Sequence, residues 1–464
     1  LNAREREQVD GYFGTVVYPV LTPLAVDPAH PFPHISNLSL SLAVVVRADS
    51  GPERFARVKI PQVLPRLVPV KPLPNSPGRR RARPDAVFVW LEDLIAAHLQ
   101  SLFRGLAVTQ SYAFRVVRDA DFEIREDEAG DLLQCIERGL IRRRFGSVSQ
   151  LEVSADLPED IEGLLVSNLQ ISQRDVYRSE GVLGLSCLMD LMALDRPDLK
   201  DKPFRPRIPA ALRGDMFAAI RQRDILIHHP FDSFTPVVNF VQYAANDPHV
   251  LAIKQTIYRV GSNSPIVAAL KEASDKGKQV SAMVELKARF DEENNIEWAK
   301  VLEASGVHVV YGDVNLKTHC KVLMVVRLEG DTIRRYVHLG TGNYNAKTAL
   351  LYTDLGMFTC DPQIADDVTA LFNALTGYSA DQSYSKLLVS PGGVRQGIMQ
   401  RVQREIAHAG AGRPARLIFK MNSLTDFGCA AQLYKASQAG VQVDLIVRGS
   451  CCLVPGVAGL SDNI

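Results

Sequence analysis

The stretch VAALKEASDKGKQVSAMVEL (267–286) decides the fold class, because it joins an amphipathic helix to an apolar strand through a glycine. Gly277 ends the helical spacing of apolar residues, as glycine commonly does at the C-terminus of a helix. The same alternation continues on both sides, with strands expected at 249–260, 278–286 and 307–312 and helices at 266–277 and 295–306. Strands and helices that alternate at this pace indicate an α/β domain with a mainly buried sheet.

The pattern returns near the end of the chain as AAQLYKASQAGVQVDLIVRG (430–449). Gly277 and Gly440 are 163 residues apart, and Val284 and Val447 keep the same offset. An internal repeat of this kind predicts two copies of one α/β unit with a site between them.

Length and composition describe a globular chain of several domains. Its 464 residues are enough for about three domains, which we place at 1–205 (α+β), 206–385 (the first α/β unit) and 386–464 (the start of the second). The 53 Lys and Arg residues balance 52 Asp and Glu residues, and this net charge of +1 argues against a nucleic-acid-binding chain. No apolar run approaches the ~20 residues of a membrane-spanning helix. Seven scattered cysteines without a CxxC pair indicate a reducing cytoplasm.

Three local features are expected within residues 1–205. The Pro-rich, basic stretch 71–85 predicts an exposed loop. Residues 87–103 have the apolar spacing of a helix. Residues 127–146 predict another helix, with an acidic start and a basic end that suit the helix dipole.

The stretch KTHCKVLMVV (317–326) begins with polar residues and continues as an apolar strand. Side chains alternate along a strand, so His319 and Lys321 are expected to share one face. A Gly-bounded turn, GTGN (340–343), follows. His-x-Lys followed by Gly-Thr-x-Asn is similar to the half-site of the phospholipase D superfamily.

This half-site predicts phosphoryl chemistry. A neutral His319 nitrogen would attack phosphorus and become a phosphohistidine. Lys321 would offset phosphoryl charge in the transition state, and Asn343 would donate to a phosphoryl oxygen. A structural role for His319 is the alternative. His338 competes for the role, but it has Gly340 rather than a lysine two residues later.

Two arginines lie where ligands bind in open α/β sheets, just past the C-terminal ends of strands. Arg259 and Arg289 are 30 residues apart, and His319 follows after another 30. Arginine at such ends suits bidentate contact with phosphate. The acidic neighbours of Arg289 at 291–293 offer it structural partners instead.

Long segments of the chain closely resemble bacterial polyphosphate kinases of the phospholipase-D-like type. The resemblance covers nearly the whole chain, including LAIKQTIYRVGSNSPIVAALKEASDKGKQVSAMVELKARFDEENN, KTHCKVLMV, HLGTGNYNAKTALLYTDLG and LIVRGSCCLVPGVAGLSDNI. It implies an α+β head domain at 1–205, followed by duplicated phospholipase-D-like α/β domains of which the second is truncated.

The resemblance also implies an activity and its residues. Family members reversibly transfer the terminal phosphate of ATP to polyphosphate with Mg²⁺, through a histidine that matches His319. Arg259 and Arg289 match a magnesium–phosphate site, where we expect contact through phosphate oxygens because arginine has no lone pair for a cation. Tyr352 and Arg448 match nucleotide-contacting residues. ATP or ADP and polyphosphate are thus the expected partners. A homo-oligomer formed through the head domain and a cytoplasmic location, with or without membrane association, are also expected.

Two other functions stay open at this point. Phosphodiesterases of the phospholipase D class usually have an aspartate seven residues after the histidine, where this chain has Val326. The chain could also be an assembly module without turnover. Both of its ends look like cuts through a longer protein, and the second-copy counterpart of His319 would fall near position 482, beyond Ile464. We therefore expect this stretch alone to turn over little.

Overall fold

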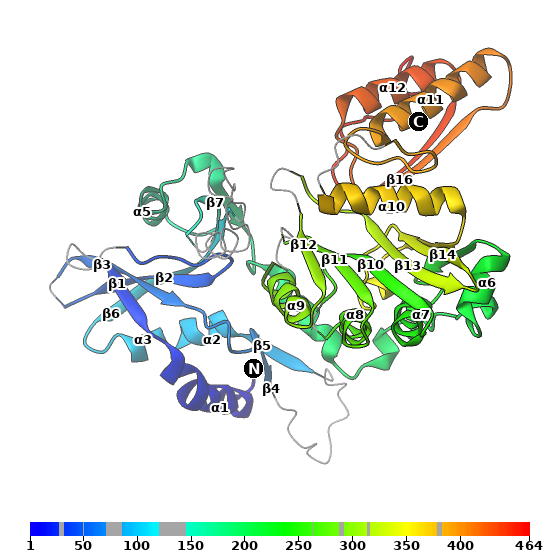
Figure 1. Cartoon of the computed structure of the whole chain (residues 1–464). Coiled ribbons are helices and arrows are strands. Elements are labelled where there is room, and N and C mark those ends of the chain that lie inside the picture. Colours follow the sequence, from blue (N-terminus) through cyan, green and yellow to red (C-terminus); the bar gives the residue numbers. More distant parts are fainter. Residues whose placement is uncertain are drawn as a thin grey trace. The chain divides into compact units, whose positions relative to one another are not determined.

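The computed structural model describes residues 1–26, 32–49, 51–70, 86–119, 145–261, 263–286, 292–312, 316–377 and 383–464. The expected basic loop at 71–85, residues 127–144 of the expected helix, and Arg289 lie outside these ranges. The chain divides into two compact units, Leu1–Phe204 and Arg205–Ile464, which we call unit 1 and unit 2 (Figure 1).

Unit 1 is built on a six-stranded sheet with the strand order β1-β3-β2-β6-β7-β8. The strands are β1 (Pro23–Val26), β2 (Leu40–Arg47), β3 (Glu53–Lys59), β6 (Ala107–Arg118), β7 (Val148–Ser154) and β8 (Val176–Ser179). Neighbours are antiparallel except for β7 and β8, which are parallel. Both faces of the sheet are covered, because Val44 and Val46 of β2 pack in one apolar cluster and Val45 packs in another. Helices α1 (Ala3–Tyr12), α2 (Leu91–Ala97) and α3 (Leu99–Leu102) complete the first cluster, and α5 (Glu159–Leu169) completes the second.

The single helix expected at 87–103 is wrong at its start. Val87–Trp90 forms a strand, β5, which pairs antiparallel with β4 (Leu67–Val70). The sequence VFVW consists of β-branched and aromatic residues, which fit a pleated surface better than a helix. The helical apolar spacing applies only from Leu91 onward, where α2 begins.

The core of unit 2 is a seven-stranded sheet with the order β12-β11-β10-β13-β14-β15-β9. The strands are β9 (Ile225–His229), β10 (Val250–Ile257), β11 (Gln279–Val284), β12 (His308–Tyr311), β13 (Lys321–Glu329), β14 (Thr332–Gly340) and β15 (Asp354–Thr359). Strands β10, β11 and β12 are parallel, as the strand–helix alternation predicts, and the other pairs are antiparallel.

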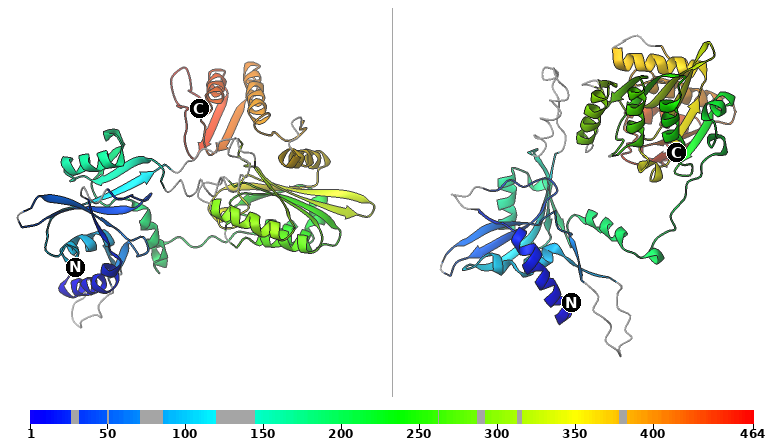
Figure 2. Two further views of the ribbon diagram at one scale, coloured as in Figure 1. Left: turned by 60° about the vertical axis from the view of Figure 1, so that its left-hand side comes forward. Right: turned by 60° about the horizontal axis from the view of Figure 1, so that its bottom comes forward.

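Helices cover both faces of this sheet (Figures 1 and 2). The helices on one face are α7 (Thr235–Asn246), α8 (Pro265–Asp275) and α9 (Glu292–Ala304), and α6 (Met216–Gln222) lies at the end of the sheet near β15. Helix α10 (Pro362–Gly377) covers the other face, where Val368 and Phe372 pack against Val322 and Met324 of β13. The sheet is therefore buried on both faces, as its apolar strands indicate.

The predicted repeat is confirmed by the backbone. The second copy consists of α11 (Val394–Gly410), β16 (Arg416–Met421), α12 (Phe427–Gln438) and β17 (Gln442–Val447), and β16 pairs parallel with β17. Gly277 and Gly440 both end a helix with positive φ, +79° and +88°, a conformation that favours glycine. The residue after each glycine donates to an equivalent carbonyl, Lys278 to Ala273 at 3.1 Å and Val441 to Ala436 at 3.0 Å.

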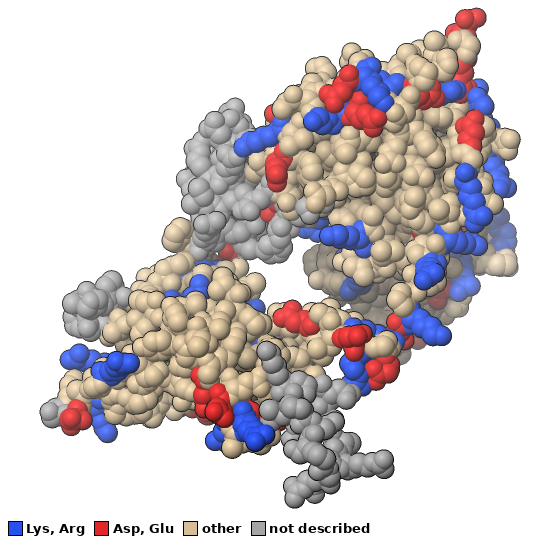
Figure 3. All heavy atoms as spheres, turned by 90° about the horizontal axis from the view of Figure 1, so that it is seen from below, with Lys and Arg blue, Asp and Glu red and all other residues tan. Residues whose placement is uncertain are grey.

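Charge is mixed over the surface. Basic and acidic side chains both occur across the face of each unit that is visible in Figure 3, in keeping with the net charge of +1. Within the described part of the chain, no helix has the length and apolar character needed to cross a bilayer. An anion site in this protein must therefore come from a local group of residues.

Candidate active site

His319 lies immediately before a strand rather than within one. The expectation placed His319 and Lys321 on one strand, but β13 begins at Lys321. Thr256 of β10 explains the difference, because its side chain replaces the backbone as hydrogen-bond partner where the pairing of β10 with β13 stops. Thr256 Oγ1 accepts from the N–H of Val322 at 3.0 Å and donates to the oxygen of Cys320 at 2.9 Å. The preceding segment is thus anchored to the sheet while His319 itself remains exposed.

The aromatic ring of Tyr258 is the centre around which the predicted residues gather. The His319 ring meets it edge-on, with centroids 5.4 Å apart. The charged nitrogens of Lys321 and Lys317 lie 5.0 and 5.3 Å from the centre of the Tyr258 ring. The Arg259 guanidinium lies 5.3 Å from the same point. Three cations therefore surround the candidate nucleophile, and the structure brings together three of the predicted residues.

The electrostatics of this group suit a nucleophilic imidazole. Loss of solvation and, after it, repulsion from Lys321, Lys317 and Arg259 together lower the pKa of His319 to about 4. His319 is therefore neutral at pH 7, which leaves a nitrogen lone pair for attack on phosphorus. Burial likewise lowers the pKa of Lys321 to about 8, so this lysine still carries its charge at neutral pH.

The glycine turn at 340–343 lies beside Lys321. The pairing of β13 with β14 places Gly340 directly opposite Lys321. Thr341 donates to the Asp354 carboxylate at 2.9 Å, and a Cβ at Gly342 would overlap that carboxylate. The turn can approach Asp354 only because residue 342 is glycine. Asn343 follows, partly exposed, and its side chain makes no hydrogen bond to another described residue.

Asn345, which the sequence analysis missed, joins this turn to Arg259. Its side-chain nitrogen donates to the backbone oxygen of Arg259 at 3.0 Å, and its side-chain oxygen accepts from the N–H of Lys347 at 2.9 Å. Arg259 has φ +52°, an uncommon conformation for a residue with a side chain. Asn345 thus supports the backbone of Arg259, the residue predicted to contact phosphate. An asparagine two residues after the GTGN turn was the available signal.

Glu285 was also missed, and it supports the segment that carries His319. Its side chain is buried, and a carboxylate oxygen accepts from the N–H of Thr318 at 2.5 Å. Asn295 donates to the backbone oxygen of Glu285 at 2.8 Å. The signal was a glutamate at the end of an apolar strand, at the position where the second copy has Arg448.

His338 is placed poorly for the role of nucleophile. It lies in β14 with 3% of its surface exposed, and its Nδ1 is 3.0 Å from the hydroxyl of Tyr344. Burial lowers its pKa to about 3, with a smaller contribution from His229. An incoming phosphate cannot reach this ring without opening the core, so the geometry favours His319.

Tyr352 and Arg448, predicted to contact a nucleotide, lie together. The Arg448 guanidinium is 5.0 Å from the centre of the Tyr352 ring. Tyr352 is 46% exposed and Arg448 is also exposed, so both remain accessible. Lys420 of β16 donates to the backbone oxygen of Thr353 at 3.1 Å, a second contact between the two copies. An exposed aromatic ring beside a cation suits a base and its phosphates.

Among the described residues, no three His, Cys, Asp or Glu side chains converge on one point. Magnesium usually takes only one or two protein carboxylates, so this finding does not decide whether it binds here. The group around Tyr258 is cationic, and oxygen ligands are what Mg²⁺ requires. The contact of Arg259 with magnesium through phosphate oxygens stays a prediction.

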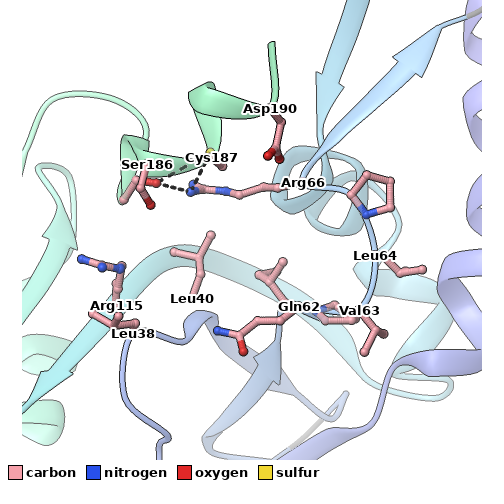
Figure 4. Close-up of a pocket in the computed structure, with 14 residues that line it drawn as sticks. Leu38, Leu40, Gln62, Val63, Leu64, Arg66, Arg115, Ser186, Cys187 and Asp190 are labelled. Carbon is pink, nitrogen blue, oxygen red and sulfur yellow. Dashed lines mark hydrogen bonds between the residues drawn. The ribbon is translucent and has the colours of Figure 1, made fainter. Parts of the chain in front are cut away.

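A cavity in unit 1 is a weaker candidate for an anion site. It has a volume of about 500 Å³ and is lined in part by Arg66 and Arg115 (Figure 4). Arg66 contacts Glu92 at 2.5 Å, and Arg115 contacts Glu152 at 2.7 Å. Both guanidinium groups are therefore neutralised by carboxylates, whereas Lys317 and Lys321 form no ion pair with a described residue.

Comparison with known proteins finds similar sequences along nearly the whole chain. Three family profiles match in succession: the polyphosphate kinase middle domain at residues 4–191, C-terminal domain 1 at 215–381 and C-terminal domain 2 at 387–464. Polyphosphate kinase 1 of Chlorobaculum tepidum is 52% identical over all of this chain and 66% of its own length. The polyphosphate kinase of Mycolicibacterium gilvum is 53% identical over all of this chain and 64% of its own length.

A solved structure gives the same result. The crystal structure of polyphosphate kinase from Porphyromonas gingivalis matches with a TM-score of 0.81 and 30% identity, over all of this chain and 67% of that one. The chain spans about two thirds of the length of these relatives. The chain belongs to the polyphosphate kinase family.

Proposed function

We propose that a protein with this sequence reversibly transfers the terminal phosphate of ATP to polyphosphate through a phosphohistidine at His319. The observation that carries the proposal is a neutral, exposed imidazole surrounded by Lys317, Lys321 and Arg259. Cations around a nucleophile attract a phosphate ester and stabilise the charge that shifts during its transfer.

The proposed reaction has two displacements. A nitrogen of His319 attacks the terminal phosphorus of ATP, the bond from that phosphorus to the bridging oxygen breaks, and ADP leaves with the electron pair. A terminal oxygen of polyphosphate then attacks the phosphohistidine, which breaks the P–N bond and restores the imidazole. Lys321 and Arg259 offset the phosphoryl charge in both steps, Asn343 donates to a phosphoryl oxygen, and Tyr352 with Arg448 holds the nucleotide. Magnesium would accompany the nucleotide on its phosphate oxygens.

The phosphodiesterase alternative has less support. The residue seven positions after His319 is Val326, which is partly buried and packs with the apolar cluster beneath α10. That position serves packing and carries no acid. Self-association through residues 1–205 and a cytoplasmic location stay predictions.

The test is labelling with ATP that carries ³²P in its terminal phosphate. We expect one acid-labile, base-stable label per chain, lost in His319→Ala. The matched control is His308→Ala, which removes an exposed histidine from β12 and should label normally. Equal labelling of His319→Ala and the unmodified protein would show that the nucleophile lies elsewhere. Cleavage of a phosphodiester reporter without ATP-dependent labelling would favour the diesterase.

A further inference from the structure

Tyr258 contacts four other side chains of the candidate site, those of Arg259, Lys317, His319 and Lys321. We call Tyr258, Arg259, Lys317, His319 and Lys321 the Tyr258 cluster. Tyr258 itself is only 6% exposed, and the other members lie around its ring. The proposed reaction assigns roles to three of its neighbours, but it assigns none to Tyr258 or to Lys317.

An aromatic ring can hold a cation without cancelling its charge. The face of the ring carries partial negative charge that attracts a cation, whereas a carboxylate would neutralise it and compete with an incoming phosphate. Lys317 and Lys321 form no ion pair with a described residue, so the Tyr258 ring is their shared support. Lys321 also donates to the backbone oxygen of His319, which ties the cation to the segment that carries the nucleophile.

The hydroxyl of Tyr258 contributes nothing comparable. It makes no hydrogen bond to another described residue, so the contacts that matter are those of the ring. The second copy of the repeat has Asn422 at the position equivalent to Tyr258, because the pair Met421–Val447 corresponds to the pair Ile257–Val284. The aromatic support therefore occurs in only one of the two copies described.

We propose that Tyr258 is a positioning residue that holds Lys317, Lys321 and Arg259 as one binding site for neighbouring phosphates of a condensed phosphate chain. The same ring also contacts the His319 imidazole and holds it toward that site. This inference rests on the proposed function and adds to it a structural reason why a chain of phosphates, rather than a single phosphate, is the preferred ligand. Lys317 is exposed, whereas Arg259 is partly buried and Lys321 is buried, so in this proposal Lys317 contacts the chain beyond the reacting phosphate.

The experiment varies the charge on the ring face while keeping its shape. Tyr258→Phe removes only the hydroxyl, and Tyr258→pentafluorophenylalanine keeps the ring but removes the negative charge of its face. Each protein is titrated with tripolyphosphate and with orthophosphate by calorimetry, and the His319 signal is followed by NMR with labelled histidine. His319→Ala identifies that signal. Thermal unfolding shows whether each variant remains folded.

We expect Tyr258→Phe to bind tripolyphosphate within about twofold of the unmodified protein and the fluorinated variant to bind roughly tenfold more weakly. Orthophosphate binding should change less, because one phosphate engages fewer of the cations. The pKa of His319 should rise in the fluorinated variant as the cations move away from it. Lys317→Gln, at an exposed position, should weaken tripolyphosphate binding and raise the same pKa without altering the fold.

Equal tripolyphosphate affinity and an equal His319 titration in the phenylalanine and pentafluorophenylalanine variants would overturn the proposal. That outcome is distinct from a failure of the proposed function, which is decided by labelling of His319 with ATP. If labelling fails while tripolyphosphate binding still depends on the ring, the cluster binds condensed phosphate but does not accept a phosphoryl group.

Discussion

The two copies of the β-α-β repeat share a backbone but use the residue after their second strand in opposite ways. Glu285 follows β11 and Arg448 follows β17, and each donates its N–H to the last residue of the preceding parallel strand, at 3.0 and 3.1 Å. Glu285 is buried and braces the segment that carries His319. Arg448 is exposed and lies over the ring of Tyr352.

The residues after the first strand differ in the same manner. Tyr258 and Arg259 follow β10, and short polar residues, Asn422 and Ser423, occupy the equivalent positions after β16. The repeat thus preserves hydrogen bonds and glycine turns while the side chains at the strand ends diverge. The predicted nucleophile and the cations around it therefore lie at the first copy, and the second copy contributes a separate contact, that of Arg448 with Tyr352.

The largest effect, on the free energy of unfolding, should come from replacing Glu285 or Arg448, the residues that distinguish the copies, with its counterpart. Glu285→Arg places a cation in a buried position and removes the acceptor for the N–H of Thr318, which should destabilise the protein by about 3–5 kcal/mol. Arg448→Glu changes an exposed residue and should alter stability by no more than about 0.5 kcal/mol. Urea unfolding measures both. Similar losses would mean that the two positions are not used differently.

Removal of the Arg259 side chain should have the next largest effect, a loss of kcat. Arg259→Ala loses a charge-assisted phosphate contact and should lower kcat on the order of a hundredfold. Lysine at this position should restore only part of the rate, because it lacks the planar fork of arginine. The control is Ser423→Ala, its counterpart in the second copy, which should remain within about twofold of normal. We expect the same loss for Arg289→Ala. Normal rates in both alanine variants would contradict the assignment.

The contact between Tyr352 and Arg448 of the second copy should show a smaller effect that is confined to nucleotide binding. Arg448→Ala and Tyr352→Leu should each raise KM for ATP about tenfold, with little change in labelling at saturating ATP. The double variant should be less impaired than the product of the two, because the cation and the ring share about 0.5–1 kcal/mol. Arg416→Ala, which removes another exposed arginine of this sheet, is the control. Full additivity would show that the two residues act independently.

The smallest effect concerns pH. His319 must be neutral to react and its pKa is lowered to about 4, so activity should fall only below that value. Lys321 must be charged and its pKa is lowered to about 8, so activity should fall above that value. Between about pH 5 and about pH 7 the rate should change less than about twofold. A steep limb near the ordinary histidine value of about 6.5 would show that the cations do not act on His319.

Local sequence patterns were enough to predict part of the fold. The helix spacing, the glycines at 277 and 440 and the apolar strands predicted the parallel strands and the repeat, since each depends on residues near one another in sequence. The same reasoning failed at 87–90, where four apolar residues fit either a helix or a strand, and pairing with β4 decided the outcome. His-x-Lys likewise predicted that His319 and Lys321 would lie close together, and both contact the Tyr258 ring.

The sequence by itself therefore determined the α/β class, the duplication and the proximity of Lys321 to His319, because each depends on residues near one another in the sequence. Only the tertiary structure decided that Tyr258 supports the cations, that Glu285 braces Thr318, and that Arg448 meets Tyr352. Each of these contacts joins residues far apart in the chain. Strand order and register bring them together, and the spacing of apolar residues along the sequence does not indicate which distant side chains will be in contact.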